Sequence, residues 1–156
     1  MSTNAPSWPD LSGRLTATGS GSSHVLPVRV YFEDTDFSGL VYHGSYLRWC
    51  ERGRSDFLRL LGNDHRALIS AAEPAAFVVR RLTLDYLKPA RIDDVLEVTT
   101  SVKTLGAASL TLLQRVTRDG VLLCDAEVMV VLVAQSGRVL RLSRVLRDIL
   151  TNADSG

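Results

Sequence analysis

The chain has 156 residues, of which 46% are hydrophobic, and this predicts one folded domain rather than two domains or a disordered polymer. Its formal net charge of +1 lacks the basic excess that a nucleic-acid partner would require. The sequence contains no apolar run of about 18 residues and no secretory signal pattern, so we expect a cytoplasmic protein without a membrane span.

The first part of the chain divides into a polar segment and a strand. Residues 1–23 are rich in Ser, Gly, Thr and Asn, and we expect them to form a mobile tail before a domain of residues 24–156. Val28, Val30 and Phe32 alternate with polar side chains, which predicts a strand with one buried face. Turn-forming residues follow from position 34.

A helix is predicted next, because apolar residues recur at intervals of three and four over residues 44–61. Ser45 or Gly44 is a candidate cap, and Gly62 with Asn63 supplies a stop. Gly53 in the middle of a helix costs about 1 kcal/mol relative to Ala. We therefore expect a sheet to pack closely against the helix at Gly53.

The rest of the chain is dominated by strand patterns and short turns. Four further strands are predicted, at residues 77–87, 95–103, 109–117 and 121–134. A short closing helix that includes Val145 and Leu150 follows, with Ser143 as its cap. Short turns make neighbouring strands antiparallel, so we expect an α+β domain in which one helix covers a five-stranded antiparallel sheet. One helix cannot cover both apolar faces of such a sheet, so we expect a second subunit to bury part of it.

Familiar cofactor and metal motifs are absent from the sequence. There is no phosphate-binding loop, dinucleotide motif or HExxH pattern, and His24, His43 and His65 are too dispersed to indicate a metal set. Cys50 and Cys124 are isolated, and we expect two buried reduced thiols. We therefore expect neither a cofactor nor a metal ion.

A polar cluster lies between the first strand and the helix: Glu33, Asp34, Asp36, Tyr42 and His43. Free N–H groups at a helix N-terminus stabilise a developing oxyanion, and a carboxylate on the preceding loop can face the same point. This pair of features is sufficient to hydrolyse an activated ester such as a thioester. The structural interpretation stays open for each residue: a turn or cap for Asp36, a hydrogen-bonding role for His43 and packing for Tyr42.

The segment VYFEDTDFSGLVYHGSYLRWCER at residues 30–52 resembles the signature of the 4-hydroxybenzoyl-CoA thioesterase-like family. More closely, it resembles the bacterial acyl-CoA thioesterases associated with the Tol-Pal system. A second match is LDYLKPARIDD at residues 84–94, and the resemblance extends over about residues 25–150. It implies a single-domain hotdog fold, homodimers often paired into homotetramers, hydrolysis of acyl-CoA to free acid and CoA, and a possible cell-envelope protein partner at the inner membrane.

The resemblance also implies roles for individual residues. Asp36 acts as a nucleophile that forms a mixed anhydride, or as a general base for water, and the choice between them stays open. His43 presents its backbone N–H to the thioester carbonyl, and its side chain assists by hydrogen bonding. Further implied substrate contacts are Tyr42, Glu51, Lys88 and Arg91, with a solvated-loop role as the alternative for the last two. Phe37, Ser38 and Gly44 depart from the family pattern, which leaves the acyl specificity open.

Two other functions compete with hydrolysis. One is the hydration or dehydration of enoyl thioesters, which usually needs an Asp–His pair arranged around the double bond. The other is a non-enzymatic module that binds acyl-CoA or an envelope partner. Release of CoA by the native protein distinguishes hydrolysis from both.

Overall fold

The computed structural model describes residues 9–18, 21–62 and 73–154. Asn63 and His65 therefore lie outside the described residues. The elements in chain order are β1 Arg14–Thr18, β2 Gly21–Arg29, the 3-10 turn η1 Phe32–Asp34, α1 His43–Leu60, β3 Ala75–Tyr86, β4 Val95–Leu105, β5 Ser109–Arg118, β6 Val121–Ala134, β7 Val139–Leu140 and α3 Arg144–Asp154.

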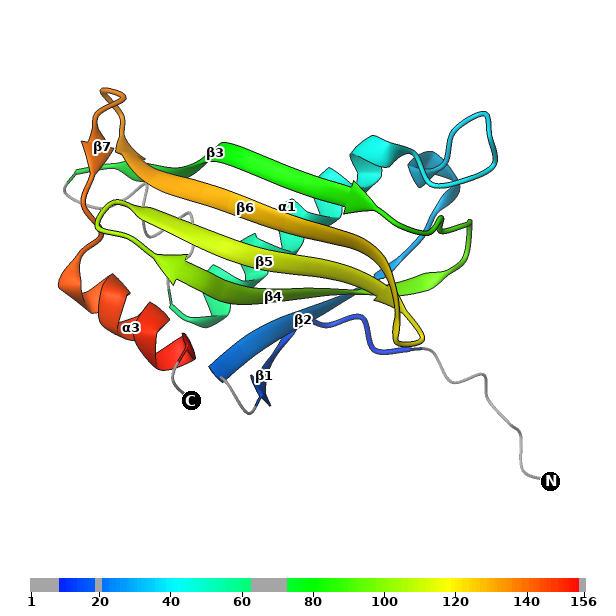
Figure 1. Ribbon diagram of the computed structural model, residues 1–156, viewed down its shortest axis with the longest axis horizontal. Coiled ribbons are helices and arrows are strands. Elements are labelled where there is room, and N and C mark those ends of the chain that lie inside the picture. The colour runs from blue at the N-terminus through cyan, green and yellow to red at the C-terminus, as the bar shows by residue number, and fades with distance from the viewer. Residues whose placement is uncertain (1–8, 19–20, 63–72, 155–156) are drawn as a thin grey trace.

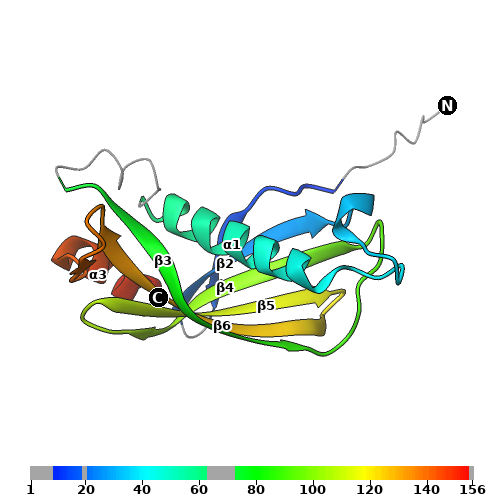
Figure 2. The same ribbon diagram turned by 90° about the horizontal axis from the view of Figure 1, so that it is seen from above.

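The described strands form one antiparallel sheet in the order β1-β2-β4-β5-β6-β3, and β7 pairs with the end of β6 (Figure 1). α1 lies along one face of this sheet, and α3 lies near the end that β2 and β4 share (Figure 2). This arrangement confirms the expected α+β hotdog fold with a short C-terminal helix. The expected count of five strands is wrong, because β1 and β7 bring the described sheet to seven.

The expectation of a tail over residues 1–23 is wrong where the structure describes a strand. β1 pairs antiparallel with β2, and β2 itself begins at Gly21. An edge strand needs only backbone hydrogen bonds to its neighbour, so a Ser- and Thr-rich segment can form one without a clear apolar alternation. The preceding Gly13 packs so closely against Asp56 and His24 that a β-carbon there would overlap the Asp56 carboxylate.

The predicted strand that includes Phe32 is partly wrong. Val28 and Val30 are buried as expected, but β2 ends at Arg29 and Phe32 belongs to η1, where its side chain is 81% exposed. The chain turns at this point because Asp34 accepts a hydrogen bond from the backbone N–H of Tyr31 at 2.9 Å. Alternation alone does not reveal such a local turn.

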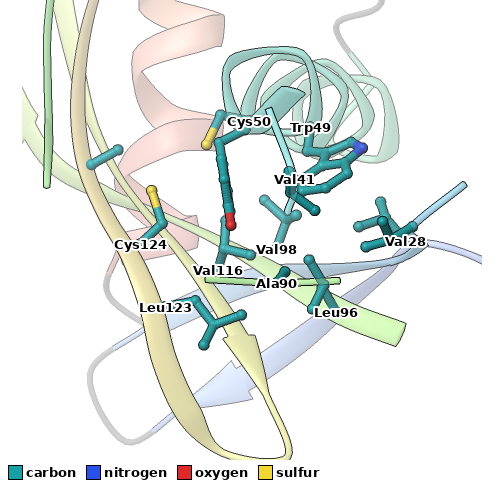
Figure 3. Packing of buried hydrophobic residues seen from close by; sticks show 13 residues of the cluster. Val28, Val41, Trp49, Cys50, Ala90, Leu96, Val98, Val116, Leu123 and Cys124 are labelled. Carbon is teal, nitrogen blue, oxygen red and sulfur yellow. The ribbon is translucent and has the colours of Figure 1, made fainter. Parts of the chain in front are cut away.

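α1 packs on the sheet along the predicted apolar stripe. Trp49 and Cys50 project from α1 towards Val98 and Val116 of the sheet (Figure 3). Cys124 lies in the same cluster, and burial raises the pKa of the Cys50 thiol to about 11 and that of Cys124 to about 12. The prediction of two buried thiols is confirmed.

Gly53 lies at a point of close approach between α1 and the sheet. A β-carbon at this position would lie 3.0 Å from Val98 Cγ1 and 3.2 Å from Thr100 Oγ1. The neighbouring Gln114 is fully buried, and its side-chain N–H₂ donates to the backbone carbonyl of Cys50 at 2.8 Å and to Thr100 Oγ1 at 2.9 Å. The expected close packing at Gly53 is therefore confirmed, with a buried polar contact across it.

β3 forms one edge of the described sheet. It is 12 residues long and pairs with β6 along one side only. Val78 and Val79 on this strand are 40% and 45% exposed. A long edge strand with exposed apolar side chains is a surface on which another strand can pair.

Among the described helices, none is both long and apolar enough to cross a membrane.

Candidate active site

Asp34 organises the loop between β2 and α1. Its side chain is buried and also accepts a long contact of 3.4 Å from the Arg48 guanidinium. Its backbone carbonyl accepts hydrogen bonds from the Tyr42 N–H at 2.8 Å and from the Ser45 hydroxyl at 3.0 Å. Asp34 is therefore a structural residue that fixes the loop to the start of the helix.

Asp36, two residues further on, has an exposed side chain. Its Oδ1 accepts hydrogen bonds from the Ser38 hydroxyl at 2.5 Å and from the Ser38 N–H at 2.8 Å. These two bonds lower the pKa of Asp36 below its ordinary value, and the nearby His43 acts in the same direction. The carboxylate is therefore ionised at neutral pH, the state that a nucleophile or general base requires.

Replacing Ser38 is expected to change the acidity of Asp36. Ser38→Ala removes the hydroxyl donor and keeps the backbone donor, so the pKa of Asp36 should rise towards its ordinary value of 3.8. Titration of the Asp36 carboxyl carbon by NMR measures the change. Asp10, whose pKa is lowered by the separate Ser12 N–H, serves as an internal reference and should not move. An Asp36 midpoint that is the same in both proteins contradicts the assignment.

The first turn of α1 offers free donors close to this carboxylate. The helix begins at His43, with Tyr42 as its N-cap, so the expected cap at Ser45 or Gly44 is wrong. Within the described contacts, the backbone N–H groups of His43 and Gly44 donate to no protein acceptor. Such donors, with the positive end of the helix dipole, suit an anion.

Aromatic rings surround these donors. The Tyr42 and His43 rings lie with centroids 4.4 Å apart, and the Tyr86 ring stands edge-on to His43 at 6.3 Å. Gly44 makes room for Tyr42, since a β-carbon at Gly44 would lie 2.5 Å from Tyr42 Cε1. The backbone N–H of Asp36 donates to the Leu40 carbonyl at 3.1 Å.

A groove of about 280 Å³ opens beside this turn, and its lining is Leu40, Val41, His43, Tyr46, Tyr86, Leu87, Lys88 and Pro89. Its walls are mostly apolar, and the lining residues with polar side-chain groups are His43, Lys88 and the two tyrosines. Leu40 links the groove to the Asp36 backbone. A groove with apolar walls and few polar groups fits a small organic ligand.

The structure brings some of the predicted site residues together and leaves others apart. Tyr42 lies beside His43, and Lys88 lines the groove. Arg91 is exposed and adjoins Leu40 through a backbone bridge. Glu51 does not reach the groove within this chain, because it lies eight positions after His43 in the helix, about 12 Å along the axis.

Glu51 instead lines a separate cavity of about 60 Å³, together with Arg54, Ser55, Leu58, Phe77, Val79, Leu112 and Val130. Its carboxylate accepts a hydrogen bond from the Ser55 hydroxyl at 2.9 Å. This cavity lies between the second half of α1 and the inner side of β3. It is therefore distinct from the groove at the start of the helix.

Two residues of the site escaped sequence reasoning. Ser38 was noted only as a departure from a family pattern, yet it holds the Asp36 carboxylate. Tyr86 lies in the second matching segment, residues 84–94, without an implied role, yet its hydroxyl donates to the His43 carbonyl at 2.8 Å. Its position three residues before Pro89, where the strand ends, was the available signal. Among the described side chains, no cluster of His, Cys, Asp or Glu could hold a metal ion.

Comparisons with known proteins show the family of this chain. A family model described as the thioesterase superfamily matches residues 38–124. The acyl-CoA thioester hydrolase YbgC of Escherichia coli is 47% identical over 108 residues, which cover 69% of this chain and 79% of that protein. The acyl-CoA thioesterase YbgC of Haemophilus influenzae is 42% identical over 105 residues, 67% of this chain and 76% of that protein.

A solved structure shares both the fold and much of the sequence. The crystal structure of a probable thioesterase from Bartonella henselae has a TM-score of 0.76 at 38% identity, and the match covers 78% of this chain and 99% of that one. The matched family segment contains the loop after Asp36, the whole of α1 and the groove residues around Tyr86. This chain therefore belongs to the thioesterase superfamily.

Proposed function

We propose that this protein hydrolyses acyl-CoA thioesters to free acid and CoA. The observation that carries the proposal is the ionised Asp36 carboxylate, which Ser38 holds and whose pKa His43 helps to lower, together with the His43 and Gly44 N–H groups, which have no acceptor among the described residues. The Escherichia coli relative, named an acyl-CoA thioester hydrolase, supports the choice of acyl-CoA as substrate. The family resemblance of residues 30–52 supports the same substrate class.

In the proposed reaction, the thioester carbonyl oxygen accepts hydrogen bonds from the first turn of α1. Asp36 either attacks the carbonyl carbon or removes a proton from an attacking water. In the first route the C–S bond breaks as a mixed anhydride forms, CoA leaves as a thiolate that takes a proton, and water then cleaves the anhydride. In the second route the water oxygen bonds to the carbonyl carbon and becomes part of the acid, the C–S bond breaks, and CoA leaves as a thiolate that takes up the proton removed by Asp36. In both, the N–H donors of the helix stabilise the oxyanion.

A panel of acyl-CoAs with thiol detection tests the activity itself. Native protein should release CoA from at least one short aliphatic, long aliphatic or aromatic thioester. Hydration of crotonyl-CoA without CoA release would favour a hydratase, and tight binding with no release would favour a binding module. Either result would contradict the proposed hydrolysis.

Isotope labelling separates the two routes. With enzyme in excess and H₂¹⁸O as solvent, nucleophilic attack by Asp36 should give an acylated protein detectable by mass spectrometry after rapid quenching, with CoA released before the acid. Attack of water on the Asp36 side of the anhydride would also leave ¹⁸O in Asp36. If CoA and acid appear together and neither adduct nor label is found, Asp36 acts as a general base.

We also propose that the active form is a homodimer, built through β3 and paired further into a tetramer. The exposed edge of β3 and its apolar Val79 support this arrangement. Tyr86 of β3 lies near the start of α1, whereas Phe77 and Val79 lie near its second half. A two-fold axis through β3 would thus bring the groove of one copy towards the Glu51 cavity of the other. Light scattering of the purified protein tests the assembly, and a monomer would contradict it.

Location and partners rest on the resemblance to Tol-Pal-associated thioesterases. We propose a cytoplasmic protein that associates peripherally with the inner membrane through a cell-envelope protein. Fractionation of cells, followed by cross-linking and mass spectrometry of the membrane fraction, tests this. Recovery of the protein in the cytosolic fraction alone, without an envelope cross-link, would contradict the peripheral association.

A further inference from the structure

Tyr86 connects the end of β3 to the first turn of α1. Its hydroxyl donates a 2.8 Å hydrogen bond to the backbone carbonyl oxygen of His43, and its side chain is 49% exposed in the wall of the groove. The proposed reaction assigns no step to Tyr86. Its bond nevertheless reaches the peptide group that lies next to the reacting carbonyl in that proposal.

The His43 carbonyl and the Gly44 N–H belong to the same peptide group. A hydrogen bond accepted by the carbonyl oxygen polarises the amide, and the N–H of that amide becomes a stronger donor. The Gly44 N–H is one of the free donors at the start of α1. The Tyr86 hydroxyl and an oxyanion bound at Gly44 would therefore be coupled through one amide.

We propose that Tyr86 is a positioning residue, which holds and polarises the peptide between His43 and Gly44 so that the Gly44 N–H binds the oxyanion more strongly. This inference rests on the proposed thioester hydrolysis and adds a residue to it. Tyr86 acts through the backbone and does not touch the reacting atoms.

The surroundings of Tyr86 keep its hydroxyl in place. Its ring packs edge-on against Tyr46 with centroids 5.5 Å apart, and Tyr46 packs edge-on against the buried Trp49 at 5.2 Å. This row of rings connects Tyr86 of β3 to the core of the domain through two residues of α1. The position of the Tyr86 side chain is therefore set by packing against the helix. Burial raises the pKa of Tyr86, so its hydroxyl stays protonated and remains a donor in mildly alkaline solution.

Tyr86→Phe tests the proposal, because it keeps the ring and removes only the hydroxyl. One oxyanion donor contributes about 10²–10³ in kcat. A neighbouring hydrogen bond strengthens such a donor by about 10–30%. We therefore expect kcat for acyl-CoA hydrolysis to fall roughly two- to eightfold, with KM nearly unchanged. Incorporation of 3-fluorotyrosine at position 86, a more acidic donor, should raise kcat above that of the native protein.

Tyr31→Phe is the matched control, because it removes a hydroxyl from a tyrosine outside the groove whose side chain is 57% exposed. It should leave kcat and KM at native values. If Tyr86 has only a structural role, Tyr86→Phe should have a lower melting temperature than the native protein. The protein with 3-fluorotyrosine at position 86 should then have the same kcat as the native protein. That result, or a native kcat in Tyr86→Phe, would overturn the proposal.

A measurement without substrate separates this inference from the proposed function. In Tyr86→Phe, the amide ¹⁵N resonance of Gly44 should shift, while that of Gly53 in the middle of α1 should not. An unchanged Gly44 resonance overturns the inference whatever the activity. Native protein that releases no CoA from any acyl-CoA refutes the proposed function instead, and the Gly44 resonance still decides whether Tyr86 polarises this peptide.

Discussion

Asp36→Asn is expected to lower kcat for acyl-CoA hydrolysis by about 10²–10⁴-fold. The amide of Asn keeps an oxygen that can accept the Ser38 hydrogen bonds, so the loop keeps its geometry. It loses the negative charge and with it the nucleophile or base. KM and the melting temperature should therefore stay close to native. Steady-state kinetics with a thiol-specific reagent and a thermal melt measure both quantities.

Asp119→Asn is the matched control for this substitution. Asp119 lies in the turn between β5 and β6 with φ of 51°, a conformation that Asn adopts readily. It is exposed and lies outside the groove. This variant should turn over substrate at the native rate. Undiminished turnover by Asp36→Asn would remove Asp36 from the mechanism and leave the helix N-terminus without its catalytic partner.

Gly53→Leu is expected to destabilise the fold. The first added carbon alone would lie 3.0 Å from Val98 Cγ1 and 3.3 Å from Gln114 Nε2, so α1 must move away from the sheet. Overpacking of this kind costs about 3 kcal/mol, whereas the better helix propensity of Leu recovers only about 1 kcal/mol. The net loss of about 2 kcal/mol corresponds to a melting temperature lower by roughly 4–8 °C.

Arg52→Leu places the same side chain one residue earlier on α1, where position 52 is exposed. Its effect on the free energy of unfolding should stay within about 0.5 kcal/mol. Calorimetry or urea unfolding compares the two variants. Equal free energies of unfolding for the two variants would show that α1 can accommodate a side chain at position 53. The close contact between helix and sheet at Gly53 would then be contradicted.

The sequence predicted the elements whose pattern is set by burial. β6 follows from a long alternation, and its bounds of Val121–Ala134 agree with the prediction. Gly53 was informative because a glycine in a helix is costly, so its presence indicated close packing. The strand at β1 was not predictable from alternation, because its short polar segment is ordered mainly by pairing with β2.

The candidate site divides in the same way. Asp36 and His43 are close in sequence and were found through local pattern and family resemblance. Tyr86 is 43 residues from His43, and their contact exists only because β3 folds back beside the start of α1. A hydrogen bond between a side chain and a distant backbone carbonyl leaves no spacing in the sequence. Such residues become visible only in the folded chain.

The loop that carries Asp36 is attached to the domain on both sides of that residue. Asp34 anchors it before Asp36, and Val41 anchors it afterwards through a 2.9 Å hydrogen bond to the Ala90 carbonyl. Phe37, between these anchors, is exposed, whereas Gly39 has a positive φ that favours glycine. Mutations of Phe37 can therefore accumulate with little cost to folding, and new substrate preferences can evolve while the carboxylate stays in place.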